Sequence, residues 1–200
     1  MNECGKLPVF HDDQHGTAIV TLAGLINAVK VVEKDIKDCK VIINGAGAAG
    51  ITIAKLLMDY GVKDMIVCDS KGAIYKGRKE GMNDAKRKIA EVTNLEGKKG
   101  KLGDVINDTD IFIGVSQEKA LRGHWVSKMA SKSIVFALAN PVPEILPEDA
   151  NVESIEMFAV VDIEQGEVGL KKRMSFVKRG QVYLNIESTI LLALNLYTSF

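Results

Sequence analysis

Apolar residues follow two different patterns along this chain. Short runs of consecutive, often β-branched apolar residues are typical of strands that are buried on both faces. Such runs lie at residues 41–43, 65–68, 110–116, 133–138 and 158–161. Elsewhere apolar residues recur every three or four positions, which indicates helices at residues 17–34, 48–60, 83–92 and 123–130. The alternation predicts an α/β fold with a doubly wound, mostly parallel sheet that is covered by helices on both faces.

Residues 162–200 depart from this alternation. Five basic residues gather there, and an apolar stretch follows at residues 190–200; the basic residues are Lys171, Lys172, Arg173, Lys178 and Arg179. One interpretation is a solvated loop followed by a packed C-terminal helix, and the other is a partner-binding or poorly ordered tail. We expect one domain over residues 1–161 and a C-terminal tail of unassigned role over residues 162–200.

A glycine-rich turn joins the first of these strands to the helix at residues 48–60. Gly45, Gly47 and Gly50 stand in the spacing G-x-G-x-x-G, and the next strand ends in Asp69. In a dinucleotide-binding βαβ unit these glycines permit a tight turn, the approach of a pyrophosphate and close helix–strand packing, in that order. The helix N-terminus offers N–H groups to the phosphates, and an acid in the position of Asp69 can accept hydrogen bonds from ribose hydroxyls. The segment predicts a Rossmann-type fold with a dinucleotide held by Gly45, Ala46, Gly47, Ala48, Ala49 and Gly50. A turn without a ligand and a plain strand-end cap at Asp69 are the alternatives.

Composition narrows the range of partners. The chain has 200 residues, of which 46% are hydrophobic and 26% charged, and its formal net charge is zero. This balance favours neither nucleic acid nor an anionic membrane as a partner. The N-terminal segment lacks the apolar core of a secretory signal, and the apolar stretch at residues 189–197 is too short to span a bilayer. The three cysteines have no metal-ligand spacing, and their odd number argues against a disulfide framework. This pattern indicates a reducing compartment, the cytoplasm or an organelle matrix, and of these we expect a cytoplasmic protein.

Two adjacent acids, Asp12 and Asp13, precede the first helix, with His11 and His15 beside them. An acid in this position can simply cap the helix. Capping needs only one acid, however, and two carboxylates beside a nucleotide fold also indicate a divalent cation with oxygen ligands. One loop cannot complete such a site, so further ligands have to come from elsewhere or from a substrate. The histidines lack zinc-site spacing, and no G-x-S-x-G motif supports an acyl-transfer triad.

Two further strands end in polar segments. Ser116 closes the run at residues 110–116, and Asn140 follows the run at residues 133–138, just before Pro141. The carboxyl ends of parallel strands border the ligand crevice of an open α/β sheet. Asn140 can therefore contact a nicotinamide, a ribose or a bound acid, and the backbone at Ser116 can pass under a cofactor. An ordinary Asn-Pro turn is the alternative.

Five segments, taken together, resemble the NAD-binding domain of the malic enzyme family, in particular its smaller prokaryotic-type members. They are Val9-Phe-His-Asp-Asp-Gln-His-Gly-Thr-Ala18, Asn44-Gly-Ala-Gly-Ala-Ala-Gly50, Cys68-Asp-Ser-Lys-Gly-Ala-Ile-Tyr-Lys-Gly-Arg78, Phe112-Ile-Gly-Val-Ser116 and Phe136-Ala-Leu-Ala-Asn-Pro-Val-Pro-Glu144. The resemblance covers residues 7–150. It implies oxidative decarboxylation of malate to pyruvate and CO₂, with NAD⁺ or NADP⁺ reduced and Mg²⁺ or Mn²⁺ required. It also implies malate or pyruvate as the small-molecule ligand and a homo-oligomer in the full-length family.

The resemblance assigns roles to the residues that match its motifs. Asp13 takes the metal-ligand position and Asp12 is its neighbour in the catalytic site. Thr17 borders the cofactor, residues 45–50 hold the pyrophosphate, and Asp69 binds the adenosine ribose. Asn140 lies at the nicotinamide side or at the substrate. An acid there favours NAD through the ribose 2′-hydroxyl, while Lys71 and Arg78 nearby leave NADP open. The paired acids and Asn140 disfavour a different amino-acid or hydroxy-acid dehydrogenase.

Two departures from the family pattern bear on activity. The family's catalytic tyrosine and lysine and its first two metal-binding acids belong to a region that would precede residue 1. After Val161 its Gly-Arg-Ser-Asp segment and Asn-Asn pair are not found. A truncated or frameshifted product would account for both. Lys30, Lys55 and Lys71 are poor replacements for the missing base, so we expect this chain alone to bind dinucleotide weakly and to turn malate over poorly or not at all. A catalytically incompetent NAD-binding module is the alternative.

Overall fold

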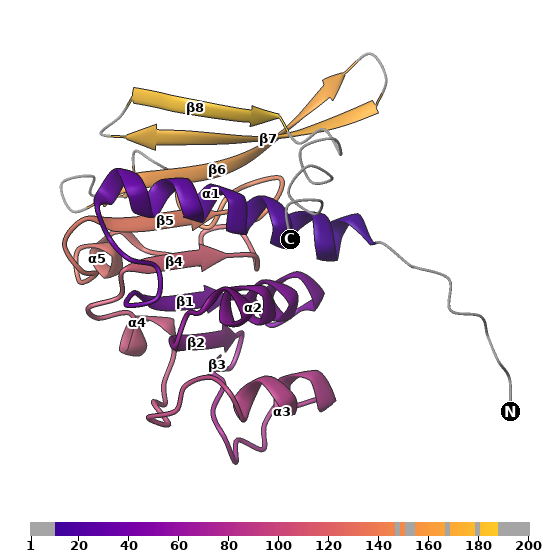
Figure 1. Ribbon diagram of the computed structural model, residues 1–200. Coiled ribbons are helices and arrows are strands. Elements are labelled where there is room, and N and C mark those ends of the chain that lie inside the picture. The colour runs from indigo at the N-terminus through magenta and orange to yellow at the C-terminus, as the bar shows by residue number, and fades with distance from the viewer. Residues whose placement is uncertain (1–10, 147–148, 151–154, 167–168, 179–180, 188–200) are drawn as a thin grey trace, which may run out of the picture.

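The computed structural model describes residues 11–146, 149–150, 155–166, 169–178 and 181–187. An eight-stranded sheet runs through these residues and has helices on both faces (Figure 1). The helical elements are η1 (Asp12–Gly16), α1 (Thr17–Val32), α2 (Ala48–Tyr60), α3 (Asp84–Ala90), α4 (Leu102–Val105) and α5 (Gly123–Val126). The strands are β1 (Lys40–Asn44), β2 (Asp64–Asp69), β3 (Gly72–Ala73), β4 (Ile111–Gly114), β5 (Ser133–Ala137), β6 (Ile155–Gly166), β7 (Gly169–Lys178) and β8 (Gln181–Glu187).

The strand order is β3-β2-β1-β4-β5-β6-β7-β8. Strands β2, β1, β4, β5 and β6 pair in parallel, whereas β3, β7 and β8 add antiparallel pairs at the two edges. The sheet is therefore mostly parallel at its centre, and the predicted doubly wound α/β fold is confirmed. The chain enters the sheet at β1, builds outward to β2 and β3, and then returns to the other side of β1 with β4. The order in which the chain adds strands thus reverses between β1 and β4, although these two strands are paired.

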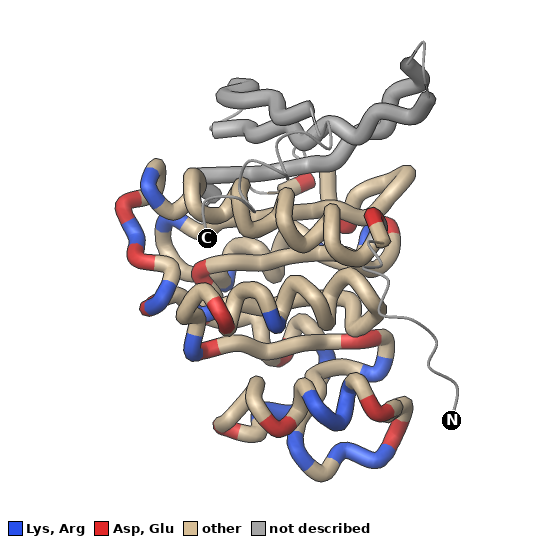
Figure 2. The backbone as a smooth tube through the Cα atoms, turned by 45° about the vertical axis from the view of Figure 1, so that its right-hand side comes forward, with Lys and Arg blue, Asp and Glu red and all other residues tan. Residues whose placement is uncertain are grey.

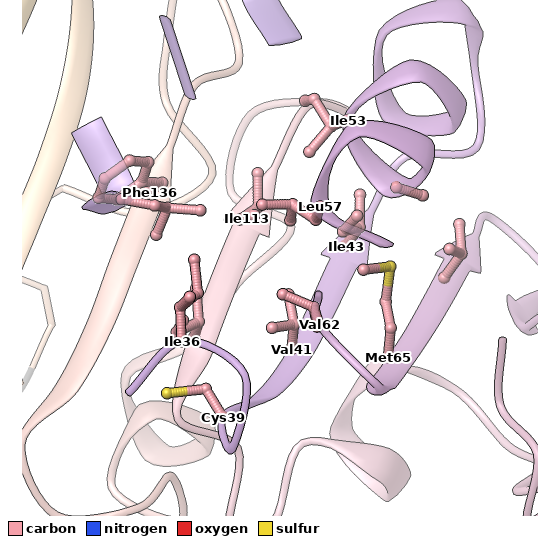
Figure 3. Packing of buried hydrophobic residues seen from close by; sticks show 14 of the residues in the cluster. Ile36, Cys39, Val41, Ile43, Ile53, Leu57, Val62, Met65, Ile113 and Phe136 are labelled. Carbon is pink, nitrogen blue, oxygen red and sulfur yellow. The ribbon is translucent and has the colours of Figure 1, made fainter. Parts of the chain in front are cut away.

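Two apolar clusters, one on each face of the sheet, form the core. On one face α1, α2 and α3 pack on the sheet, and Ile43 and Ile113 lie opposite Ile53 and Leu57 of α2 (Figure 3). On the other face α4 and α5 cover side chains such as Phe112. All the described side chains of β1, β4 and β5 except that of Lys40 are buried, because both faces of these strands are covered.

Two of the three cysteines lie within the described residues. Cys39 and Cys68 are both free and buried, one in each apolar cluster. Burial raises the pKa of Cys68 to about 12 and that of Cys39 to about 11. Both thiols therefore stay protonated at neutral pH and act as small core side chains rather than as nucleophiles.

Several sequence-based expectations need correction. Two short elements were not among the predicted helices and strands, the helical turn η1 before α1 and the two-residue strand β3 after β2. The loop predicted for the basic residues was wrong, because Lys171, Lys172, Arg173 and Lys178 lie in β7. Charged residues are common on strands near a sheet edge, so a group of basic residues does not exclude a strand there. Arg179 and the predicted helix over residues 190–200 lie outside the described residues, and β6 continues across position 161.

Helix α1 has the length and apolar composition of a membrane-spanning helix. The segment Gln14–Val32 is long and apolar enough to cross a bilayer by length and composition. However, 44% of it is buried within the protein, and Leu25, Ala28 and Val32 pack in the core cluster with α2 and the sheet. A core helix meets the same criteria, so length and composition are weak support for a span here.

Candidate functional site: the carboxyl edge of the parallel strands

The candidate site lies where the carboxyl ends of β1, β4 and β5 meet. These strands are parallel neighbours, so the loops that follow them emerge at one edge of the sheet, next to the start of α1 (Figure 1). The order of the strands reverses between β1 and β4. Such a topological switch point opens a crevice for ligands in α/β sheets. A Cβ atom added to Gly45 would lie 2.5 Å from the carbonyl oxygen of Val115. The loops after β1 and β4 are therefore in direct contact at this switch point.

The three glycines of the turn have three different environments. Gly45 has a φ of +128° and lies against the backbone at Val115, so both its conformation and its surroundings require glycine. A Cβ atom on Gly50 would come closer than 3.0 Å to the carbonyl oxygen of Gly45, so α2 can pack on the turn only through a glycine. A Cβ atom on Gly47 would meet nothing within 4 Å. The open side of Gly47 is where a pyrophosphate can approach the backbone.

Helix α2 begins at this open side. Its N-cap residue is Gly47, no side chain caps it, and its first turn carries no acidic residue. The first N–H groups of a helix have no partner within the helix, and the helix dipole adds a partial positive charge. Ala48 is exposed, Ala49 is half-buried and Ala46 packs against the core, so the turn presents backbone rather than side chains. This end of α2 can accept an anionic group such as a pyrophosphate.

Asp69 ends β2, beside the glycine turn, and its side chain is only 8% exposed. It forms ion pairs with Arg78 and with Lys86, whose Nζ lies 2.6 Å from Oδ2. Arg78 donates to both carboxylate oxygens, and the backbone N–H of Lys71 donates to Oδ1 at 2.9 Å. Each oxygen of Asp69 thus accepts two hydrogen bonds. Lys and Arg residues gather on the segments around α3, from which these partners come (Figure 2).

These partners set the protonation state of Asp69. Burial acts to raise its pKa, but the hydrogen bonds from Arg78, Lys86 and the Lys71 backbone outweigh it and lower the pKa to about 2. A carboxylate with a lowered pKa contributes stability above its unfolded-state pKa of about 3.9 and loses that contribution as the pH falls toward 2. Asp69 is therefore ionised at neutral pH and ties the segment that carries Arg78 and Lys86 to the end of β2.

We expect the loss of these interactions of Asp69 to lower the stability of the chain in acid. The full pKa shift of Asp69 corresponds to roughly 2.5 kcal/mol in the free energy of unfolding. Solvent near the sheet edge screens the charges and reduces this to about 1–2 kcal/mol. The free energy of unfolding of the natural chain should fall by that amount between about pH 4 and pH 2 through Asp69. In an Asp69→Asn variant this part of the decline should be absent, which urea titrations at each pH measure. Equal declines in both proteins would contradict the assignment.

The loops after β4 and β5 are joined by a residue to which sequence reasoning gave no role. Ser116 and Asn140 are exposed at the carboxyl edge, and Glu144 is buried beneath them. The Glu144 carboxylate accepts hydrogen bonds from the backbone N–H groups of Ser116, at 2.9 Å, and Ala139, at 3.0 Å. Burial raises the pKa of Glu144, while these hydrogen bonds oppose the rise. A buried acid after a Pro-Val-Pro segment resembles any surface turn residue in sequence, so the pattern gave no signal for it.

The paired acids lie in η1, the turn that leads into α1. Gln14 Nε2 donates to Thr52 Oγ1 of α2 at 3.0 Å, which holds η1 beside the N-terminal half of that helix. Asp12 is exposed, and its carboxylate lies over Gly16, where a Cβ atom would clash with it. Thr17 is half-buried in the first turn of α1. The turn that carries the predicted metal and catalytic residues thus lies close to the dinucleotide end of α2.

The residues that the structure describes do not by themselves complete a metal centre. Among them there is no group of three or more His, Cys, Asp or Glu side chains that could hold an ion. Asp12 and Asp13 come from one turn, and a Mg²⁺ or Mn²⁺ ion in a protein needs oxygen ligands from more than one segment or from a substrate. No chemical step through a metal can be built from this part of the chain alone.

The switch point, the glycine turn and the uncapped start of α2 define a dinucleotide-binding domain of the Rossmann type. Comparisons with known proteins identify its family. A sequence model described as the NAD-binding domain of malic enzyme matches residues 14–156, and the chain belongs to the malic enzyme family. The resemblance that the five sequence segments carried is therefore confirmed.

Individual relatives agree with this assignment. The chain is 61% identical over 145 residues to a bifunctional malic/malolactic enzyme of Bacillus subtilis, covering 72% of this chain and 35% of that protein. It is 51% identical over 142 residues to an NAD-dependent malic enzyme of Geobacillus stearothermophilus, covering 71% and 30%. The crystal structure of an NAD-dependent malic enzyme from Thermotoga maritima superimposes with a TM-score of 0.75 at 45% identity, covering 79% of this chain and 42% of that one. The chain spans about a third of the length of these two curated relatives.

Proposed function

We propose that this chain is the dinucleotide-binding part of a malic enzyme, which oxidises and decarboxylates malate to pyruvate and CO₂ with reduction of NAD⁺ or NADP⁺. The observation that carries the proposal is the open face of Gly47 at the start of α2. It belongs to the turn whose Gly45 lies against Val115 at the switch point between β1 and β4. Relatives named as NAD- and NADP-dependent malic enzymes support the reaction. Ser116 and Asn140 lie at the same edge, where the nicotinamide and the substrate would be held.

For the cofactor itself we favour NAD, because an acid ends β2 in the position that contacts the ribose 2′-hydroxyl. Both oxygens of Asp69 already accept two hydrogen bonds each, so a ribose hydroxyl has to replace a donor. Lys86, at 17% exposed, is the more accessible of the two cationic partners and the one that a ribose can displace. Titration calorimetry with both cofactors tests this choice. Tenfold tighter binding of NADP⁺, roughly 1.4 kcal/mol, would contradict it.

The described residues do not by themselves form a metal centre. We propose Asp13 as a metal ligand and Asp12 as its neighbour in the site. The further oxygen ligands then have to come from other segments or from malate. Among the described residues there is also no cluster of metal-ligating side chains at the crevice that could replace them. A dinucleotide-binding module without its own turnover is therefore the second candidate function, and this observation favours it for the chain alone.

A steady-state assay separates the two candidates. The purified 200-residue chain, supplied with malate, Mn²⁺ and NAD⁺, is expected to bind the dinucleotide and to form NADH slowly or not at all. The physical reason is that proton transfer needs a group within hydrogen-bond reach of the reacting atoms. Robust turnover, proportional to protein concentration, would show that this chain holds a complete catalytic set and would overturn the second candidate.

The buried thiols Cys39 and Cys68 agree with a cytoplasmic location, which we also propose.

A further inference from the structure

Glu144 is a carboxylate in an unusual place. Its exposed fraction is 0%, and within the described part of the chain it forms no ion pair with a lysine, arginine or histidine. Removing a carboxylate from water is costly unless its oxygens are satisfied by hydrogen bonds. Here the donors are backbone N–H groups and the Ser116 hydroxyl, at 3.4 Å from Oε1. Such a costly group needs a compensating structural role.

The two oxygens of Glu144 bind two different loops. Oε1 accepts the N–H of Ser116, which follows β4, and Oε2 accepts the N–H of Ala139, which follows β5. Gly114 leaves the space that the carboxyl group fills, because a Cβ atom there would come within 3.0 Å of it. The Glu144 backbone is held in turn by Leu121, whose N–H donates to its carbonyl at 3.1 Å. The side chain thus fixes the distance between two strand-end loops.

The network continues to the strand that carries the glycine turn. Asn44, the last residue of β1, donates from Nδ2 to the Ser116 hydroxyl at 2.9 Å. Asn44, Ser116, Glu144 and Ala139 therefore connect the carboxyl ends of three adjacent strands. Asn140 follows directly after Ala139, so its position also depends on Glu144.

We propose that Glu144 is a positioning residue that shapes the nicotinamide end of the dinucleotide crevice by holding the loops after β4 and β5 together. The inference rests on the proposed function and deepens it. The adenosine and pyrophosphate end is built by other groups, namely the glycine turn and Asp69 at the end of β2. Loss of the Glu144 carboxylate should therefore affect the two halves of a dinucleotide unequally.

The test compares NAD⁺ with ADP-ribose, which lacks the nicotinamide. A Glu144→Gln variant keeps the size of the side chain but replaces one acceptor oxygen with an NH₂ group, which cannot accept from a backbone N–H. We expect the dissociation constant for NAD⁺, measured by calorimetry on the full chain, to rise about tenfold, while that for ADP-ribose changes less than twofold. Faster hydrogen exchange at the Ser116 and Ala139 amides, with α2 unchanged, should accompany the change.

Other outcomes would overturn the inference. Equal weakening of NAD⁺ and ADP-ribose would show that Glu144 only stabilises the fold, and no change in either would show that it has no role in binding. A natural chain that bound neither ligand would contradict the proposed function itself. If the variant does not fold, NMR titration of the natural chain decides: the Ser116 and Ala139 amides should shift with NAD⁺ and stay in place with ADP-ribose. Equal shifts with both ligands would contradict the proposal.

Discussion

A Gly47→Ala variant should remain folded and lose at least nine-tenths of its affinity for NAD⁺. A Cβ atom at Gly47 meets no protein atom within 4 Å, and the residue has a φ of −83°, which alanine adopts without strain. The added methyl group instead occupies the space through which a pyrophosphate would approach the start of α2. Tenfold weaker binding corresponds to roughly 1.4 kcal/mol. Calorimetry with NAD⁺ measures it directly.

The same variant separates binding from stability. Alanine is a poorer N-cap residue than glycine, so we expect the free energy of unfolding to fall by less than about 1 kcal/mol. Affinity for ADP-ribose should fall together with affinity for NAD⁺, because both ligands carry the pyrophosphate. This joint loss distinguishes Gly47→Ala from the selective loss expected for Glu144→Gln. Unchanged affinity for both ligands would place the pyrophosphate elsewhere.

A Gly50→Ala variant should show the opposite behaviour, a large loss of stability. The new Cβ atom would lie closer than 3.0 Å to the carbonyl oxygen of Gly45. Gly45 cannot easily move away, because the space beside it is taken by the backbone at Val115, whose carbonyl oxygen would lie 2.5 Å from a Cβ atom on Gly45. Overpacking of a close backbone contact typically costs about 1–3 kcal/mol and can cost more, and we expect about 3 kcal/mol here.

Urea denaturation measures this loss. The midpoint should fall while the denaturant slope stays constant, which indicates a change of stability without a change in the surface exposed on unfolding. Gly47→Ala serves as the matched control, since it adds the same methyl group three residues away in open space. Similar stability of the two variants would mean that α2 does not pack on the turn through Gly50.

The centre of the fold could be predicted because its physical constraints leave a clear pattern. Strands β1, β2, β4 and β5 are covered on both faces, so they read as consecutive apolar residues. The bounds of α2, residues 48–60, were predicted correctly, and Gly61 ends the helix at a φ of +113°. The tight turn at Gly45 and the close helix packing at Gly50 were also predictable, because each follows from a steric requirement on the backbone.

The remainder of the site depends on contacts between distant segments, for which a sequence pattern carries no signal. Asp69 was predicted to be an acceptor for a ribose, but its four hydrogen bonds from Lys71, Arg78 and Lys86 come from the loop and helix that follow. Glu144 lies in a polar turn in the sequence and is fully buried in the fold. The basic strand β7 was missed because a strand near a sheet edge does not need an apolar pattern.

We expect this chain alone to bind a nicotinamide dinucleotide at the turn between β1 and α2. Titration calorimetry of the natural 200-residue chain with NAD⁺, without malate or metal, tests it most directly. We expect saturable binding to one site per chain, and at least tenfold weaker binding by Gly47→Ala. The absence of saturation up to about 5 mM NAD⁺, which means less than about 3 kcal/mol of binding free energy, would contradict it.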